Sequence, residues 1–115
     1  MKELNEKIID ALEAHNFGVC SNDAQAGAYV AELETSSPKE FEDVTITIWH
    51  DGTIPGFVMA FREYANDFNA DEYAAECISN RRKNGWPYSV RAEIDDAEAI
   101  KKMLDDVADA LEKIA

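Results

Sequence analysis

One stretch of strict alternation, Asp43–His50, most constrains what this chain can fold into. Its sequence, DVTITIWH, places an apolar residue or the histidine at every second position, with two threonines and Trp49 between them. Alternation of this kind, in β-branched and aromatic residues, is typical of a strand with one buried and one exposed face. The flanking segments have the spacing of amphipathic helices, so we expect their apolar stripes to pack on the buried face of this strand.

Two further strands are predicted upstream of the central one. A short strand over Gly18–Ser21 leads into a turn at residues 22–23, and Ala28–Thr35 then alternates with Glu32 and Glu34 on its exposed face. The connections between these strands are too short for parallel crossovers. The sequence therefore predicts a small antiparallel sheet of two to three strands.

Four segments carry apolar residues at helical spacing. The first is predicted over Glu3–Asn16 and ends at Gly18, which supplies a residue in the left-handed conformation. The second begins at residues 53–55, where a proline in the first turn is tolerated, and its apolar stripe runs to Phe68. Both stripes face the expected sheet.

The third helix is predicted to begin after the N-cap Asn69 and to end in the basic run 81–83, where the helix dipole favours cations. Residues 86–88, Trp-Pro-Tyr, are expected to form a rigid linker, and Ser89 to cap a short turn. The fourth helix is predicted to begin after the N-cap Asp95 and to run to the C-terminus.

The predicted order α–β–β–β–α–α–α describes a single α+β domain over residues 1–115, with about four helices packed on one face of the sheet. The charged, amphipathic N-terminus has the character of neither a signal peptide nor a membrane span. Two cysteines do not make a disulfide framework. We therefore expect a cytoplasmic protein that does not bind membranes.

The net charge of −13 is the most unusual property of the composition. Residues 8–80 hold fourteen acidic residues against only Lys39 and Arg62, whereas residues 81–115 hold eight acidic and seven basic residues. A negative field repels nucleic acid and membrane surfaces and attracts basic proteins. Solubility is the alternative explanation of an acidic surface, and the uneven placement of the charge adds weight to a basic partner.

The residues that bind soft metals lack the spacing of a metal site. Closely paired zinc ligands are missing among the histidines and cysteines, which are His15, Cys20, His50 and Cys77. His50 ends the buried face of the central strand and Cys77 lies on the apolar stripe of a predicted helix, so core packing is the simpler interpretation of both. We expect no metal and no cofactor.

The sequence carries no catalytic signature either. The run DFNAD at 67–71 begins like a calcium loop, but Glu72 and Ile78 stand where the glycine and the bidentate glutamate belong. No glycine-rich phosphate loop is present. We therefore expect a protein that is not an enzyme, with a catalyst based on His50 or Cys77 as the least favoured alternative.

Aromatic residues suggest two possible contact surfaces. Trp49 points to the face opposite the core, where either another helix covers it or it anchors a partner. The basic run 81–83 lies near Trp86 and Tyr88, as in some nucleic-acid-binding patches, but its position at a helix end already explains it. We expect no direct contact with nucleic acid.

Five motifs lie in the C-terminal half: FREYANDF at 61–68, NADEY at 69–73, PYSVR at 87–91, IDDAEAI at 94–100 and LDDVADAL at 104–111. In these motifs the chain resembles a family of short acidic proteins of bacterial mobile elements and prophages, over roughly half its length (57–111). That family brings no assigned activity. The charge and element order of the N-terminal two thirds are also similar to those of small DNA-mimic inhibitors, including anti-CRISPR proteins, without matched residues.

The leading hypothesis is a non-enzymatic protein that inhibits a basic, nucleic-acid-binding host-defence protein, of anti-CRISPR or anti-restriction type, by presenting carboxylates in place of phosphates. Exposed acids recur at about 5–6 Å on helices and about 6–7 Å on strands, close to the phosphate spacing of one nucleic-acid strand. The alternative is a structural or assembly module that forms a homodimer through Trp49 or the aromatic residues at 86–88. The candidate partner-binding residues are Asp23, Glu32, Glu34, Glu40, Glu42, Asp43, Trp49 and Asp51 from the sheet and its loops, and Asp67, Asp71, Glu72 and Glu76 from the corner between the second and third helices.

Overall fold

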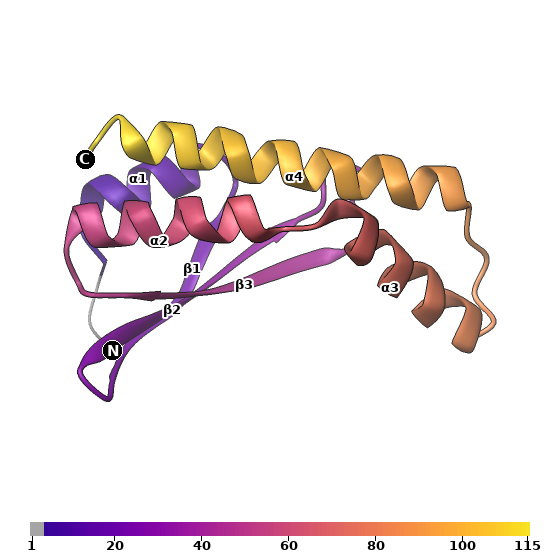
Figure 1. Cartoon of the computed structure of the whole chain (residues 1–115), viewed down its shortest axis with the longest axis horizontal. Coiled ribbons are helices and arrows are strands. Elements are labelled where there is room, and N and C mark those ends of the chain that lie inside the picture. Colours follow the sequence, from indigo (N-terminus) through magenta and orange to yellow (C-terminus); the bar gives the residue numbers. More distant parts are fainter. Residues whose placement is uncertain (1–3) are drawn as a thin grey trace.

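The protein forms a three-stranded antiparallel sheet, in the order β1-β2-β3, with helices on one of its faces, as the computed structural model shows for residues 4–115 (Figure 1). The predicted α+β class, the order of the elements and the antiparallel sheet are confirmed. The elements are α1 (Glu6–Glu13), β1 (Gly18–Gln25), β2 (Ala28–Ser36), β3 (Asp43–His50), α2 (Ile54–Asp67), α3 (Ala70–Lys83) and α4 (Val90–Glu112).

The sheet has one buried face and one open face. In β3 the even-numbered residues from Val44 to His50 are buried and the odd-numbered residues from Asp43 to Trp49 are exposed, which confirms the predicted alternation. From Ala31 onward β2 alternates in the same way, because paired residues of neighbouring strands point to the same side. We refer below to the solvent-exposed side of the sheet as the open face.

The helices pack against the buried face of the sheet and against one another. α1 packs on β1 and α2 on β3, while α4 lies across α1 and α2 and continues beside α3 (Figure 1). The largest fully buried side chains include Phe17, Phe57 and Phe61, each of which contributes about 1.5–3 kcal/mol through its burial. α3 extends past the end of the strands and buries only Ala74, so it is the least enclosed of the helices.

The turn between the first two strands lies further along the chain than predicted. The expected turn at residues 22–23 is wrong: Asn22 is 3% exposed and belongs to β1, where its side chain bonds to His50 across the sheet. The chain instead turns at Ala26 and Gly27, whose φ angles of 51° and 83° suit a two-residue hairpin. A buried polar pair thus overrides the turn propensity of Asn-Asp.

The first helix ends at a different left-handed residue from the one predicted. Asn16, with φ of 65°, takes this conformation, and Gly18 is instead the first residue of β1. The amide of Phe17 donates to the carbonyl of Leu12 at 3.0 Å, as in a Schellman motif, which Asn also supports. The predicted start at Glu3 lies outside the described residues.

The last helix begins six residues earlier than predicted. Ser89 is its N-cap and accepts a hydrogen bond from the amide of Ala92 at 3.3 Å, so the predicted cap at Asp95 is wrong. Asp95 lies inside the helix and pairs with Arg91 at 3.5 Å. The extra turn is favoured by Glu93, whose carboxylate binds Arg81 of α3. No helix within residues 4–115 is both long and apolar enough to cross a membrane.

His50 closes the core at the end of β3. It is 7% exposed, and its ring stacks on Tyr29 and contacts Phe57 edge-on. The amide of Gly52 donates to Nδ1 at 3.1 Å, so Nε2 carries the proton and donates to Asn22 at 2.8 Å. Burial lowers the pKa of His50 below its ordinary 6.5, although nearby Asp51 partly opposes this.

We expect the folded protein to lose stability as the pH falls through about 6.5. At that pH His50 begins to bind a proton in the unfolded chain but not in the folded one, where its pKa is lower. The loss continues down to the lower folded-state pKa, with a slope of at most about 1.4 kcal/mol per pH unit from this group. Urea unfolding between pH 7.5 and 5.5 measures it. His50→Gln should show a shallower pH dependence, and an unchanged one would contradict this assignment.

Candidate protein-interaction surface

Four carboxylates cross the open face in one diagonal line. Asp23 of β1 pairs with Val30 of β2, and Asp43 of β3 pairs with Ser36 of β2. Between these two positions, β2 contributes its own exposed acids. Each even-numbered position of β2 from 30 to 36 is therefore either a glutamate or paired with an aspartate of a neighbouring strand, and we call each such position a level of the sheet. We call this set the carboxylate line; it consists of Asp23, Glu32, Glu34 and Asp43.

The spacing of this line follows from sheet geometry. Glu32 and Glu34 are two residues apart on one strand, a distance of about 6–7 Å. Asp23 and Asp43 lie one strand to either side and one level further along, and such diagonal neighbours are about 7–8 Å apart. The line is therefore regular, and the strand ladders hold its backbone rigidly.

Among residues 4–115, no basic residue forms an ion pair with this charge. The three strands contain no lysine or arginine, and no ion pair from any described residue reaches the carboxylate line. Most acidic residues of α4, by contrast, form an ion pair with a lysine or an arginine. The pairs there include Arg62–Glu112 at 2.5 Å, Lys101–Asp105 at 3.0 Å and Lys102–Asp106 at 2.8 Å. The charge imbalance in the sequence thus becomes an uncompensated surface on the sheet.

Trp49 lies beside the carboxylate line on the same face. It pairs with Val30, at the level of Asp23, and 55% of its surface is exposed. None of the described helices covers it. The open face therefore combines a large apolar side chain with a row of carboxylates, while Thr45 and Thr47 leave the rest of β3 flat.

Cys20 is a member of this surface that sequence reasoning did not identify. β1 changes register between Val19 and Ser21, and the exposed Cys20 thiol donates to Glu34 Oε2 at 3.5 Å. Local desolvation and the neighbouring glutamates raise the pKa of this thiol, so it stays protonated as a hydrogen-bond donor. The position of Cys20 beside Glu34 follows from the register shift, which the sequence pattern does not show.

Three further acids predicted to bind a partner lie in loops around the sheet. Asp51 Oδ1 accepts hydrogen bonds from the Thr53 amide at 2.9 Å and hydroxyl at 2.6 Å, which lower its pKa and fix the start of α2. Glu42 is half-buried and binds Arg81. Glu40 is exposed, with a left-handed φ of 58°. Internal contacts thus already engage Asp51 and Glu42, whereas Glu40 remains accessible.

The remaining predicted acids gather at the corner between α2 and α3. Asp67, Glu72 and Glu76 line a hollow of about 340 Å³ together with aromatic side chains, whereas Asp71 is exposed outside it. Apart from the three loop acids and Asp71, the predicted acids therefore lie on two separate surfaces, the carboxylate line and this corner.

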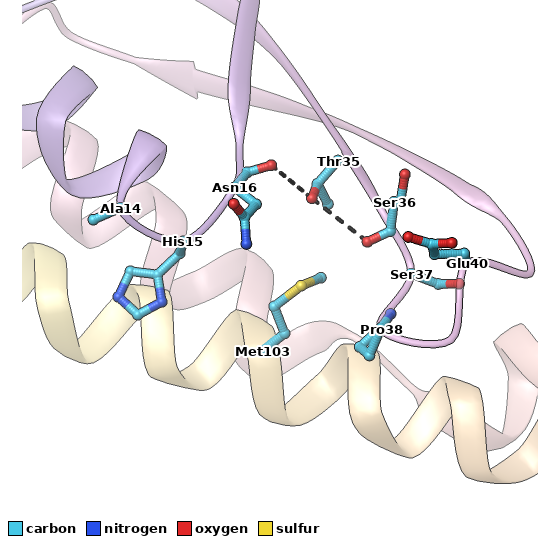
Figure 2. A pocket seen from close by; sticks show the side chains of 9 residues that line it. All are labelled: Ala14, His15, Asn16, Thr35, Ser36, Ser37, Pro38, Glu40 and Met103. Atoms are coloured by element: carbon cyan, nitrogen blue, oxygen red, sulfur yellow. Dashed lines mark hydrogen bonds between the residues drawn. The ribbon is translucent and has the colours of Figure 1, made fainter.

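A larger hollow of about 620 Å³ lies between the end of α1, the loop after β2 and α4 (Figure 2). Within it, the Thr35 hydroxyl donates to the carbonyl of Asn16 at 2.8 Å. His15 lines it as well, but in the described chain no hydrogen bond joins His15 to Ser36 or Ser37. The hollow thus holds no assembled nucleophile and base.

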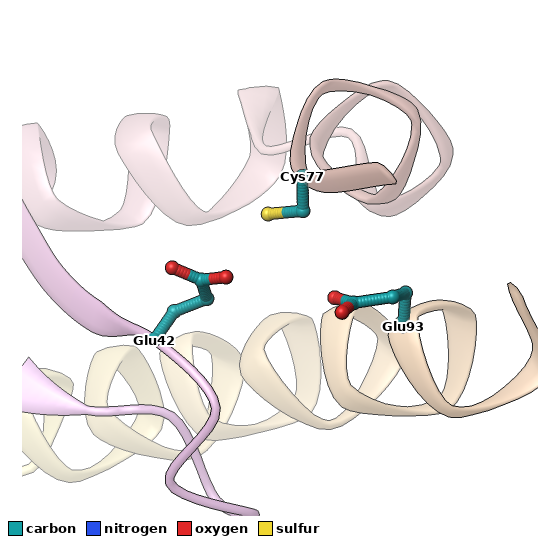
Figure 3. A group of neighbouring side chains, drawn as sticks. All are labelled: Glu42, Cys77 and Glu93. Atoms are coloured by element: carbon teal, nitrogen blue, oxygen red, sulfur yellow. The ribbon is translucent and has the colours of Figure 1, made fainter. Parts of the chain in front are cut away.

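Glu42, Cys77 and Glu93 point toward one another, with possible ligand atoms within 4.8 Å (Figure 3). The guanidinium of Arg81 hydrogen-bonds to both carboxylates and so already supplies their counter-charge. Burial, reinforced by the two glutamates, raises the pKa of Cys77 to about 11, which keeps the thiol protonated. This cluster is best described as an ion-paired structural joint between α3, α4 and the loop before β3.

Comparisons of the chain with protein-family models, with curated proteins and with solved structures give no match. The open face is therefore interpreted from its own geometry and charge.

Proposed function

We propose that the chain is a small, non-enzymatic interaction protein whose open face binds a basic, nucleic-acid-binding protein in place of nucleic acid. The observation that carries this proposal is the carboxylate line, four regularly spaced and uncompensated acids on a sheet face that no described helix covers. A host-defence protein that acts on nucleic acid is the proposed class of partner. A prophage or another mobile element is the proposed origin of the chain.

The physical case for mimicry rests on spacing and rigidity. Steps of about 6–8 Å between carboxylates are close to the separation of successive phosphates along a nucleic-acid strand, so arginines and lysines that bind a phosphate row can meet the acids in turn. Strand ladders fix the backbone beneath the acids before binding. Little backbone conformational entropy is then lost on association, which favours affinity.

Trp49 gives this surface a contact that does not depend on charge. A tryptophan that is 55% exposed buries a large apolar area when a partner covers it, and tryptophan is enriched among residues that dominate binding energy. The proposed interface therefore has an apolar anchor at one end of the carboxylate line.

A capture experiment with competition tests this proposal. The immobilised protein is incubated with bacterial lysate at low salt, and bound proteins are eluted either with duplex DNA at constant ionic strength or with a salt gradient. We expect a nucleic-acid-binding protein that duplex DNA releases and that salt releases steeply. A bound protein that duplex DNA fails to displace would contradict mimicry.

Self-assembly is the second candidate function, and exposed aromatic residues favour it at the linker before α4. Phe41, Trp86 and Tyr88 are 43%, 56% and 38% exposed there. A dimer through the open face is disfavoured, because it would set one carboxylate line against another. Light scattering after size exclusion separates the candidates: a dimeric mass that reverts to monomer in Trp86→Ser would favour assembly at the linker.

A further inference from the structure

The corner between α2 and α3 holds a groove with an unusual combination of side chains. Its volume is about 340 Å³. The last turn of α2, the connecting residues and the first two turns of α3 form its walls. We call it the corner groove; it is lined by Tyr64, Asp67, Phe68, Asn69, Glu72, Tyr73 and Glu76.

Three aromatic rings give the corner groove neutral π surfaces. The rings of Phe68 and Tyr73 lie 5.4 Å apart between centroids with their planes tilted by 44°, and Tyr64 is half-buried in the last turn of α2. Burial raises the pKa of both tyrosines, so their rings carry no charge in the physiological range. The electron-rich faces of such rings attract cations.

The carboxylates of the corner groove have no counter-ion within the described chain. Glu72 and Glu76 are four residues apart on α3, a spacing at which like charges destabilise a helix. The same spacing on α4 joins opposite charges, as in Lys101–Asp105 and Lys102–Asp106. Neither Asn69, whose side chain caps α3, nor any other lining residue supplies positive charge. A bound cation would therefore relieve a repulsion that the fold leaves in place.

The arrangement suits a planar organic cation better than a metal ion. Within residues 4–115, the cluster of Glu42, Cys77 and Glu93 is the one group of three acidic or metal-binding side chains with ligand atoms within 4.8 Å of one another. The three acids of the corner groove thus do not bring their ligand atoms together around one ion. Aromatic surfaces between separated carboxylates match a guanidinium, which stacks on rings and forks to carboxylates.

We propose that the corner groove binds the side chain of an arginine presented by a basic protein partner. The guanidinium lies against the aromatic rings and hydrogen-bonds to the carboxylates at the rim. This site is separate from the open face, because α2, α3 and the residues that connect them form it, and α2 packs on the opposite side of the sheet. Its test requires no knowledge of the natural partner.

A capped tripeptide, acetyl-Gly-Arg-Gly-amide, titrated into ¹⁵N-labelled protein tests this site by NMR. We expect saturable shifts concentrated at residues 64–76, and weaker binding of the lysine peptide, because an ammonium cannot stack on the rings. Glu72→Gln/Glu76→Gln should weaken arginine binding roughly five- to tenfold. The matched control is Glu63→Gln/Glu98→Gln, which removes the same charge from exposed helix positions and should bind as the parent does.

Two further variants test the contribution of the rings. Phe68→Leu should also weaken binding several-fold, while Tyr73→Phe, which keeps the ring, should preserve it. If Phe68→Leu fails to fold, the glutamate variants still decide the outcome. Equal weakening in the two glutamine pairs, or shifts spread over the whole surface, would show charge attraction without a site and would overturn the proposal. Either result leaves the open-face proposal intact.

Discussion

The substitution pair Glu32→Lys/Glu34→Lys is expected to weaken binding of the captured basic partner by at least roughly 100-fold, with the fold intact. These glutamates are the two central members of the carboxylate line, so each reversal removes one attraction and adds one repulsion against a basic surface. Both side chains are exposed and point away from the core. Surface plasmon resonance with the captured partner measures the affinity, and urea unfolding confirms the fold.

The matched control for this variant is Glu63→Lys/Glu98→Lys. Both residues are exposed on helices, and the change in net charge is the same. If the partner reads the carboxylate line, the control should lose only the small part of its affinity that comes from the long-range field, and that part should disappear at high salt. Equal losses in the two variants would mean that net charge, rather than this line, attracts the partner.

Alternation in the sequence was sufficient to predict the open face but not the carboxylate line. The exposure of Glu32, Glu34 and Trp49 follows from a period of two within each strand, which is a local property. The line also needs Asp23 at the level of Val30, which depends on the hairpin at 26–27 and therefore on register between strands. The sequence pattern predicts a turn at residues 22–23, which would place Asp23 in a loop. That prediction is wrong, and Asp23 instead belongs to this row.

The corner groove shows a different limit of the sequence. The sequence predicts an apolar stripe that reaches Phe68 and a corner before the N-cap Asn69, but the groove that the half-buried rings of Tyr64, Phe68 and Tyr73 line depends on how the two helices meet. Similarly, the sequence pattern predicts only a short turn at Ser89. The contact that supports the start of α4 there comes from Arg81, which lies twelve residues away from Glu93 in the chain. Contacts of this kind are tertiary, and no pattern within one segment reveals them.

Arg81 links α3 to two other parts of the molecule. Its Nε donates to Glu93 of α4, and its Nη2 donates to Glu42 of the loop before β3 and to the carbonyl of Phe41. The Glu93 side chain is only 5% exposed, and that of Arg81 is 19% exposed. Removing the guanidinium would therefore leave a carboxylate that is nearly enclosed and has lost its ion-pair partner.

Arg81→Met is accordingly expected to lower the free energy of unfolding by about 3 kcal/mol, toward the low end for a broken buried pair because Arg81 retains some contact with solvent. The comparison is Arg91→Met. The Arg91 side chain is 86% exposed in its pair with Asp95, so its loss should change the free energy of unfolding by less than about 0.5 kcal/mol. Urea unfolding midpoints measure both. The double variant Arg81→Met/Glu93→Leu should recover much of the loss, because the buried carboxylate is then gone as well. Similar midpoints for Arg81→Met and Arg91→Met would show that the cluster of Glu42, Cys77 and Glu93 does not depend on Arg81, and would reopen it as a possible metal site.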